Sequence, residues 1–387
     1  MNILFVSNYL NNHQIPLSEG LFAMLGSQFH FLQTEPMPQE RIQLGWEIDP
    51  SRYPFLVEYH RKDPAFIRQL ISQADVILHG DTRLPVFRYP MKRDALIFFY
   101  RERLFKKGQE PSFLQSLWLR HRYAAAGRQR AVLCASAYAS GDFHKIGLRV
   151  PCFQWGYFPP FRKYDLEKLF SGKKREETGI LWAGRMISWK HPEAAVELAE
   201  GLRAAAVPFH MELVGSGEME QVLSARIRQS GLEDAVSMPG SLPQREVRRK
   251  MEQANILLVT SDFNEGWGAV INEGMNSGCT VVASHGAGAA PFLISSGKNG
   301  ILYPSGDWES LLRNVVHIIR SPEAMEKMGR AAYHTIADQW NGEAAARRLL
   351  QLAEDLRENR GTCYESGLCS SAEILKNDWY ENGRKSR

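Results

Sequence analysis

Short runs of apolar residues alternate with longer segments of mixed polarity along most of the chain. A strand that is buried on both faces shows such a continuous apolar run instead of an alternation between polar and apolar positions. Strands that alternate with helical segments predict an α/β fold with parallel, doubly wound sheets. The runs expected to form strands are 3–6, 74–78, 95–99 and 131–134 in the first half, and 179–183, 211–214, 255–260, 280–283 and 301–303 in the second.

Two segments carry clear helical signals. Asp63 followed by Pro64 has the form of an N-cap with proline in the first turn, which predicts a helix over 65–72. Residues 343–358 repeat apolar side chains with the period of a helix. The sequence therefore predicts regular helices in both the first half and the last part of the chain.

The length of 387 residues, with 44% hydrophobic content, is enough for two globular domains. We expect an amino-terminal domain over 1–165 and a carboxyl-terminal domain over 175–342. The stretch 151–174 contains Pro159-Pro160, several aromatic residues and a charged end, so it is predicted to be the linker. Residues 361–387 are predicted to form a polar tail.

Charge and cysteine content limit the classes of partner and compartment. The chain has 47 Lys and Arg against 43 Asp and Glu, a net charge of +4, which is too small to argue for nucleic acid as the main partner. The five cysteines are scattered and lack the spacing of a zinc site. The amino terminus lacks the charged and apolar regions of a signal peptide, so we expect a reduced, cytoplasmic protein.

The segment between the strands 255–260 and 280–283 has the strongest chemical signal. Glu265 and Glu273 are separated by seven residues, and the first is followed directly by Gly266-Trp267-Gly268. Ionised carboxylates only accept hydrogen bonds, so two of them can bind vicinal sugar hydroxyls from two directions. Glycines allow a ligand to approach the backbone, and amides at a helix start favour an anion. This combination predicts a nucleotide-sugar site.

This segment resembles the E-x7-E signature of retaining GT-B glycosyltransferases of the family four, or glycosyl transferases group 1, type. Members of this family occur in bacterial capsule and exopolysaccharide pathways. The resemblance extends over the flanking segments 276–284 and 297–307. It implies two Rossmann-like doubly wound domains facing a central cleft, and a last helix, about 343–360, that packs back on the amino-terminal domain.

The resemblance also implies roles for particular donor-site residues. Arg185 and Lys190 would contact the donor pyrophosphate, and Glu265 and Glu273 would meet the hydroxyls of the sugar and the ribose. A guanidinium and an ammonium suit a leaving diphosphate, although two solvated loop cations remain the alternative. Phe292 stands where many relatives have glutamate, which leaves the donor sugar open. The expected donor-binding set is Gly184, Arg185, Lys190, Leu242, Glu265, Gly266, Trp267, Gly268, Val270 and Glu273, and the catalytic candidates are Glu265, Arg185, Lys190 and Glu102.

Acceptor-side candidates lie after two strands of the first half. His13 and Gln14 belong to the polar loop after the first strand, and we expect them to touch the donor phosphate or the acceptor. Arg101 and Glu102 follow the strand 95–99, where relatives commonly have histidine. An ordinary polar loop and a surface ion pair are the respective alternatives.

A basic segment lies in the same half. Residues 81–130 contain twelve Lys or Arg and four Asp or Glu, which leaves a net charge of +8. Leu114, Leu117 and Trp118 in this segment have the i, i+3, i+4 spacing of a helix face. The segment suits an anionic membrane surface or a lipid-diphosphate acceptor. The alternative is a solvated helix face whose aromatic residues belong to the core; RNA binding is a remote third.

The reaction implied by the resemblance is transfer of a hexose-type sugar, with retention, from a nucleotide-sugar to a glycan or lipid-linked acceptor in surface polysaccharide synthesis. UDP is preferred over GDP as the nucleotide. The leaving phosphate would deprotonate the acceptor, so no protein base is required. The chain has no Asp-x-Asp motif, and no metal or other cofactor is expected. We expect the enzyme in the cytoplasm, at the inner face of the plasma membrane.

Two other functions remain open, and one is excluded. A nicotinamide-dependent oxidoreductase should carry Gly-x-Gly-x-x-Gly after its first strand, but residues 7–14 contain no glycine. A catalytically silent sugar-nucleotide-binding scaffold would have the same donor groups. A GT-B sugar-nucleotide epimerase would share the fold.

Overall fold

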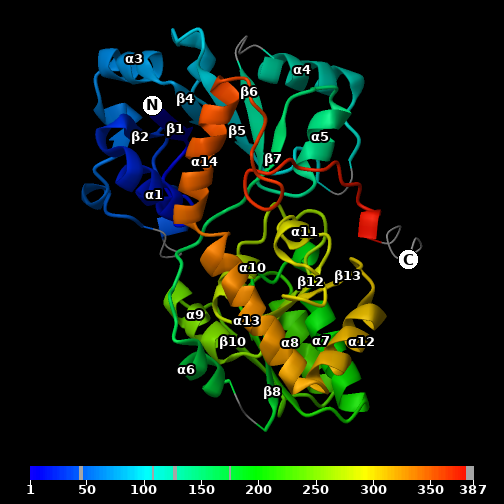
Figure 1. The fold of residues 1–387 in the computed structure, drawn as a ribbon. Helices are drawn as coiled ribbons and strands as arrows, with labels where there is room; N and C mark the ends of the chain where they lie inside the picture. Colours follow the sequence, from blue (N-terminus) through cyan, green and yellow to red (C-terminus); the bar gives the residue numbers. More distant parts are fainter. Residues whose placement is uncertain (43–46, 107–108, 125–128, 174–175, 381–387) are drawn as a thin grey trace. The chain divides into compact units, whose positions relative to one another are not determined.

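The computed structural model describes residues 1–42, 47–106, 109–124, 129–173 and 176–380, and these form two compact units. Among the described residues, unit 1 contains Met1–Pro160 and Gln339–Lys376, and unit 2 contains Phe161–Asp338 and residues 377–380. The boundary between Pro160 and Phe161 lies inside the stretch that was predicted to be the linker (Figure 1). No helix among the described residues is both long and apolar enough to cross a membrane.

Unit 1 is built on a parallel sheet in which seven described strands follow the order β3-β2-β1-β4-β5-β6-β7. The strands are β1 (Ile3–Ser7), β2 (Phe29–Gln33), β3 (Leu56–Glu58), β4 (Val76–His79), β5 (Leu96–Arg101), β6 (Arg130–Cys134) and β7 (Cys152–Gln154). The α-helices are α1 (Ile15–Leu25), α2 (Gln39–Arg41), α3 (Pro64–Gln73), α4 (Phe113–Ala124), α5 (Ala139–Lys145) and α14 (Gly342–Arg357).

Unit 2 contains a second parallel sheet, with six described strands in the order β10-β9-β8-β11-β12-β13. The strands are β8 (Thr178–Ala183), β9 (Phe209–Val214), β10 (Val236–Gly240), β11 (Ile256–Val259), β12 (Thr280–Ser284) and β13 (Ile301–Tyr303). The α-helices are α6 (Leu166–Ser171), α7 (Glu193–Ala204), α8 (Glu220–Gln229), α9 (Gln244–Gln253), α10 (Val270–Asn276), α11 (Ala290–Leu293), α12 (Trp308–Ile319) and α13 (Pro322–Asp338).

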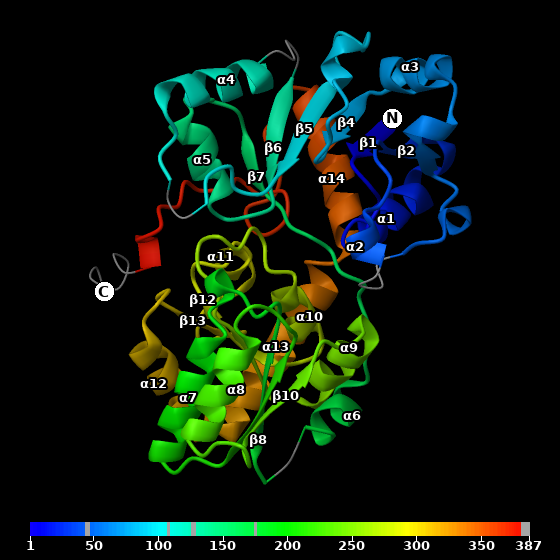
Figure 2. The same ribbon diagram turned by 180° about the vertical axis from the view of Figure 1, so that it is seen from behind.

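Burial of the central strands explains their continuous apolar runs. Every residue of β1, β11 and β12 is buried. In unit 2, α13 covers one face of the sheet while α7 and α8 cover the other (Figures 1 and 2). Because both faces are covered by helices, both sides of each central strand must be apolar. The two doubly wound α/β domains predicted from the sequence are present.

Four strands were not predicted from the hydrophobic pattern. The strands β3 and β7 have only three residues each, so they show little pattern. Polar His30 interrupts β2, and β10 contains Ser237 and Pro239. The stretch predicted as a linker therefore contains one edge strand of the unit 1 sheet, β7, and also the short helix α6. Edge strands are specified mainly by the neighbour that they pair with.

The helix predicted near the end of the chain, α14, packs against α1 within unit 1 (Figure 1). Asn341 caps α14 by accepting a hydrogen bond from the Ala344 amide at 2.9 Å. Gly342 allows a very close approach, because a Cβ atom there would lie 2.4 Å from the backbone carbon of Pro16.

The segment after α14 has more structure than a polar tail. Ser371 forms an antiparallel bridge with Phe153, and Leu368 and Cys369 are buried in unit 1. In unit 2, the Tyr380 hydroxyl donates a hydrogen bond to the Leu302 carbonyl oxygen at 2.8 Å. These isolated contacts have no sequence period, which is why the hydrophobic pattern did not reveal them.

The apolar residues predicted to line one face of α4 do not belong to the core, which was one of the two alternatives for this segment. Leu114, Leu117 and Trp118 are exposed, whereas Phe105, in the same basic segment, is buried. Lys107 and Arg128 of that segment lie outside the described residues. The helical spacing was correct, but it does not indicate burial here.

We predict that Gly342→Ala lowers the stability of the protein by about 1–3 kcal/mol, because the new methyl group must displace the backbone of Pro16. Helix propensity alone would favour alanine. Gly361→Ala is the matched control, since a Cβ atom there would meet nothing within 4 Å. Thermal unfolding of the three proteins measures the difference, and equal Tm values for the two variants would contradict the packing argument.

Candidate functional site

The strand order of unit 2 brings two distant loops together. The order reverses between β8 and β11, and ligands of open α/β sheets bind beyond the carboxyl ends of strands at such a reversal. The loop 184–190 follows β8, and the loop 260–269 follows β11. The two predicted donor-binding segments therefore lie beside each other, although about seventy-five residues separate Lys190 from Glu265.

An ion pair joins these two loops. Lys190 Nζ lies 2.5 Å from Glu265 Oε2, and Ser261 Oγ donates to the same carboxylate oxygen at 3.0 Å. Both charged side chains are largely buried. The carboxylate of Glu265 is thus neutralised and oriented by groups from both sides of the strand reversal.

Trp189 lies between the two predicted cations. The ammonium of Lys190 is 5.0 Å from the centroid of the Trp189 ring, and the guanidinium of exposed Arg185 is 5.7 Å from it. A cation over an aromatic face is attracted by the ring quadrupole. No role was predicted for Trp189 from the sequence, although its position between Arg185 and Lys190 was a usable signal.

The glycine turn after β9 supports the Arg185 loop. A Cβ atom on Gly215 would lie 1.8 Å from the carbonyl oxygen of Gly184, and the backbone at Gly215 has a positive φ of 141°. The Gly184 amide donates to the Val214 carbonyl oxygen at 3.0 Å. Only glycine permits this contact between the β8 and β9 loops, so the turn has a packing role here.

The Gly266–Gly268 turn begins the approach to α10. Gly268 has a positive φ of 89°, which side chains rarely adopt, and its carbonyl oxygen accepts from the Ile271 amide at 2.9 Å. Trp267 is buried, and its indole N–H donates to Asn272 Oδ1 at 2.8 Å. Val270, the first residue of α10, is partly exposed. The Trp267 side chain therefore anchors the turn.

Glu273 lies on α10 and is only partly exposed. Gln244 Nε2, at the start of α9, donates to Glu273 Oε1 at 3.2 Å. Desolvation raises the pKa of Glu273, while the nearby Arg248 and Gln244 oppose that rise. Leu242 is partly exposed in the loop before α9, where the Ser241 hydroxyl lies 2.7 Å from the Ser216 hydroxyl.

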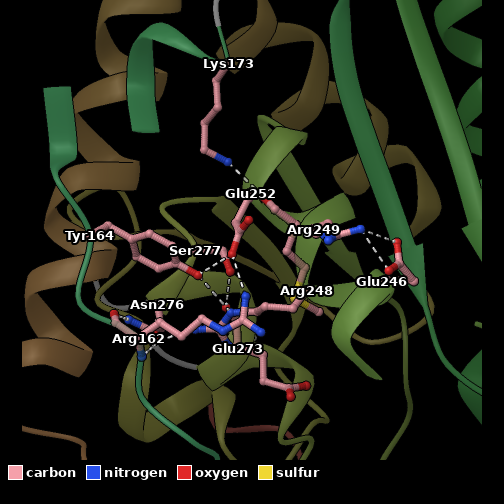
Figure 3. A network of polar contacts seen from close by, with 11 residues as sticks. Arg162, Tyr164, Lys173, Glu246, Arg248, Arg249, Glu252, Glu273, Asn276 and Ser277 are labelled. Carbon is pink, nitrogen blue, oxygen red and sulfur yellow. Dashed lines mark hydrogen bonds and ion pairs between the residues drawn. The ribbon is translucent and has the colours of Figure 1, made fainter. Parts of the chain in front are cut away.

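A partly buried polar network fixes the helix that carries Glu273 (Figure 3). The guanidinium of Arg248, on α9, donates to Asn276 Oδ1 and, at 3.3 Å, to the Tyr164 hydroxyl. Asn276, on α10, also accepts from the Arg162 amide and donates to the Arg162 carbonyl oxygen, both at 2.9 Å. The network ties α9, α10 and the first residues of unit 2 together.

Glu252 completes this network. It accepts from the Tyr164 hydroxyl at 2.6 Å and from Arg162 Nη1 at 2.8 Å (Figure 3). Satisfied buried networks hold their members in one arrangement, whereas removing one partner leaves the others uncompensated. The position of Glu273 relative to Gln244 therefore depends on this network, whose members were not predicted from the sequence.

His191 forms a second charged link between the β8 and β11 loops. Its Nδ1 lies 2.8 Å from Glu193 Oε1, and its Nε2 lies 3.5 Å from Asp262 Oδ2. The hydrogen bond to Asp262, followed by the one to Glu193, raises the pKa of His191 to about 9. The imidazole is therefore a cation at neutral pH.

In unit 1, the four predicted acceptor-side residues line one cavity. His13, Gln14, Arg101 and Glu102 surround a space of about 430 Å³. The cavity lies at the carboxyl ends of β1, β4 and β5, and the strand order reverses between β1 and β4. The topology thus brings together residues from two separate loops.

His13 and Gln14 are held by neighbours within unit 1. The His13 ring stacks on Tyr157 with centroids 5.7 Å apart. Burial, and secondly Arg41, lowers the pKa of His13 to about 4, so the ring is neutral at neutral pH. Gln14 Nε2 donates to Ser7 Oγ at 3.2 Å.

Arg101 and Glu102 have different surroundings. Arg101 Nη1 donates to the carbonyl oxygens of His79 and Gly80 at 2.6 and 2.7 Å, so part of its hydrogen-bonding capacity serves the end of β4. Glu102 accepts from the Tyr157 hydroxyl at 2.8 Å and lies 3.8 Å from Lys106 Nζ. Of these two side chains, only Glu102 has oxygen atoms that can accept a hydrogen bond from a ligand hydroxyl.

Comparisons with known proteins are consistent with this geometry. Residues 165–335 match the family model for "Glycosyl transferases group 1". WcaL of Salmonella typhimurium, named as a glycosyltransferase of colanic acid biosynthesis, is 29% identical over 183 residues, 46% of this chain and 45% of WcaL. The amylovoran biosynthesis glycosyltransferase AmsK of Erwinia amylovora is 29% identical over 182 residues, 46% of this chain and 44% of AmsK. The match spans about half the length of these relatives.

Solved structures resemble the chain over most of its length. HepE of Anabaena, solved with UDP and glucose, has a TM-score of 0.64 at 16% identity, covering 92% of this chain and 99% of HepE. Sucrose-phosphate synthase of Thermosynechococcus elongatus has a TM-score of 0.64 at 15% identity, covering 93% of this chain and 100% of that one. The predicted GT-B fold of two Rossmann-like domains is confirmed, and the match to the glycosyl transferases group 1 model lies within unit 2.

We predict that protonated His191 stabilises unit 2 by at most about 3 kcal/mol. Because folding raises its pKa from 6.5 to about 9, this stabilisation is full below pH 6.5 and is lost as the pH rises through 9. The Tm difference between the wild type and His191→Asn should therefore narrow between pH 6.5 and pH 9.

Asn is chosen at position 191 because the backbone there is left-handed, with φ 48°, which asparagine tolerates. Asp262→Asn is the companion variant, since it removes one carboxylate charge without changing the shape of the side chain. Without the Asp262 carboxylate the pKa of His191 should rise less on folding, so the Tm difference caused by His191→Asn should narrow at a lower pH. A Tm difference that stays constant from pH 6 to pH 10 would refute the role of His191.

Proposed function

We propose that this chain, whose second unit carries a glycosyl transferases group 1 domain, is a retaining glycosyltransferase. It transfers a hexose-type sugar from a nucleotide-sugar to a glycan or lipid-linked acceptor, and UDP is preferred over GDP as the nucleotide of the donor. The observation that carries the proposal is the Lys190–Glu265 ion pair at the strand reversal, 2.5 Å long, with Arg185 and Trp189 beside it.

The donor roles follow from the chemistry of these groups. Lys190 and Arg185 bind the diphosphate, which gains negative charge as it leaves. When the ammonium of Lys190 turns toward a phosphate, an oxygen of Glu265 is released for a hydroxyl of the sugar. Glu273 accepts hydrogen bonds from the ribose, while Gln244 and the Arg248 network hold its carboxylate in place.

Retention requires that the acceptor attacks the face from which the diphosphate leaves. The bond from C1 to the phosphate oxygen breaks, the bond from C1 to the acceptor oxygen forms, and the acceptor proton moves to the leaving phosphate. In this scheme no side chain acts as the base, and no metal is needed. Glu102, oriented by Tyr157, is the residue of unit 1 best suited to receive an acceptor hydroxyl.

Two observations support the biological setting. WcaL and AmsK are named for colanic acid and amylovoran biosynthesis, which favours a role in surface polysaccharide synthesis. All five cysteines are free thiols, which suits a reducing compartment such as the cytoplasm.

We expect one class of nucleotide-sugar to raise the Tm of the wild type but not of Glu273→Ala. A ligand at about 100 times its Kd adds about 2.7 kcal/mol of stability, which a thermal-shift assay detects. The screen compares UDP-, GDP- and ADP-sugars. Glu246→Ala is the control, because Glu246 is also a partly exposed glutamate on a helix of unit 2, and it pairs within its own helix, α9, with Arg249 at 2.9 Å. No shift in the wild type with any nucleotide-sugar would count against a donor site.

We expect Lys190→Met to lower kcat about 10²–10³-fold, because it removes a charge that stabilises the leaving diphosphate. Release of UDP from UDP-glucose, with water as the acceptor, gives a readout that does not require the natural acceptor. Lys250→Met is the matched control, since Lys250 forms a similar pair with Glu212 at 2.6 Å. If the wild type shows no turnover and Lys190→Met still binds the donor, a catalytically silent binding scaffold would be favoured instead.

A further inference from the structure

The most unusual surface of unit 1 is the outer face of α4. Four large apolar residues there are exposed: Phe113 by 81%, Leu114 by 75%, Leu117 by 53% and Trp118 by 59%. Soluble proteins rarely group this much apolar surface on one short element without a partner. The inner side of α4 is occupied by Ser116, Leu119 and Tyr123, so the exposed residues are not needed to attach the helix.

The helical period arranges these residues as one stripe. At about 100° per residue, Phe113, Leu117, Leu114 and Trp118 fall on an arc of about 140°. Arg120 borders the stripe on one side and Arg122 on the other, and both are exposed. The guanidinium of Arg122 lies 5.4 Å from the ring of Trp118, so a cation and an aromatic ring share one edge of the stripe.

The charge of α4 is entirely positive. The helix contains no Asp or Glu, and the acidic residue shortly before it, Glu110, is paired with Lys145 at 2.6 Å. Two other cations of the basic segment point inward, since Arg103 is buried beside Asp142 at 3.4 Å and Arg101 donates to backbone carbonyls, whereas Arg83, Arg88 and Arg93 are exposed outside α4. The exposed arginines of α4 itself, Arg120 and Arg122, lie at the two borders of the apolar stripe.

We propose that α4 is a docking surface for an anionic lipid bilayer. An apolar stripe that enters the boundary between headgroups and acyl chains, with arginines at its borders and tryptophan at the interface, is the pattern of a helix lying in the membrane plane. Arginine side chains at the borders can reach lipid phosphates while their stems stay on the apolar side. This inference does not depend on the proposed transferase reaction.

A second copy of the chain is the competing occupant. Two copies of α4 would bring four arginines together without an acid on either helix, which opposes such pairing. An anionic surface matches both the stripe and its border, so it is the occupant favoured by charge.

Flotation of the full chain with vesicles tests the proposal. We expect retention on vesicles that contain phosphatidylglycerol and much weaker retention on phosphatidylcholine alone. Leu114→Gln/Leu117→Gln should lower the partition coefficient tenfold or more. Arg120→Gln/Arg122→Gln should lower it about fivefold for each arginine, and added salt should reduce the difference.

Matched controls separate α4 from general surface effects. Val222→Gln removes an apolar residue of α8 that is 66% exposed, and Arg347→Gln removes an exposed cation of α14; neither should change retention. The wild type staying off anionic vesicles, or both double variants binding as well as the wild type, would overturn the proposal. Sedimentation that shows a dimer lost in the same double variants, without vesicle binding, would assign the surface to a second copy.

The donor assay keeps this result distinct from the proposed reaction. The α4 variants should keep the thermal shift that a nucleotide-sugar gives to the wild type, because α4 belongs to unit 1 and the donor residues belong to unit 2. Loss of vesicle binding with an unchanged donor shift would locate the effect in docking. Loss of the donor shift as well would show that the substitutions damage the fold and would remove their support for α4.

Discussion

Each sheet reverses its strand order beside its first strand, β1 in unit 1 and β8 in unit 2, and the candidate sites lie at these reversals. Connections between parallel strands are right-handed, so a change in the direction of winding moves the connecting helices to the opposite face. The loops on either side of the reversal then diverge and leave space above the carboxyl ends of the strands. In unit 2 this space is bordered by the Lys190 and Glu265 loops, and in unit 1 by the His13 and Glu102 loops.

Opposite charges hold the loops of unit 2 in place without a ligand. Lys190 pairs with Glu265, and His191 lies between Glu193 and Asp262, so two neighbouring residues after β8 each contact the loop after β11. Partly buried charges need such partners, because desolvation disfavours an isolated ion. In the proposed reaction, a diphosphate would compete with Glu265 for Lys190, so donor binding would exchange one partner of the ion pair for another.

Close backbone packing gives these charges their positions. Gly215 allows the β9 loop to touch Gly184, and Gly268 allows the chain to turn into α10. The hydrogen bond between Arg248 and Asn276 connects α9 to α10, so the helix that carries Glu273 is positioned by contacts away from the Glu273 carboxylate. The site is therefore as dependent on glycines and buried polar contacts as on the charged residues that face a ligand.

The α/β class and most central strands could be predicted from the sequence, and the spacing of Glu265 and Glu273 could be read from it, because apolar runs, helix caps and short spacings are local properties of the chain. The sequence could not show that Lys190 pairs with Glu265, that Arg101 serves the carbonyl oxygens of β4, or that Gly215 serves packing, since these depend on residues brought together by the sheet. The helix α4 shows the same limit, because an i, i+3, i+4 pattern is identical for a core face and for an exposed stripe. Only the tertiary structure decides which face is covered, because burial is a property of the neighbours and not of the helix.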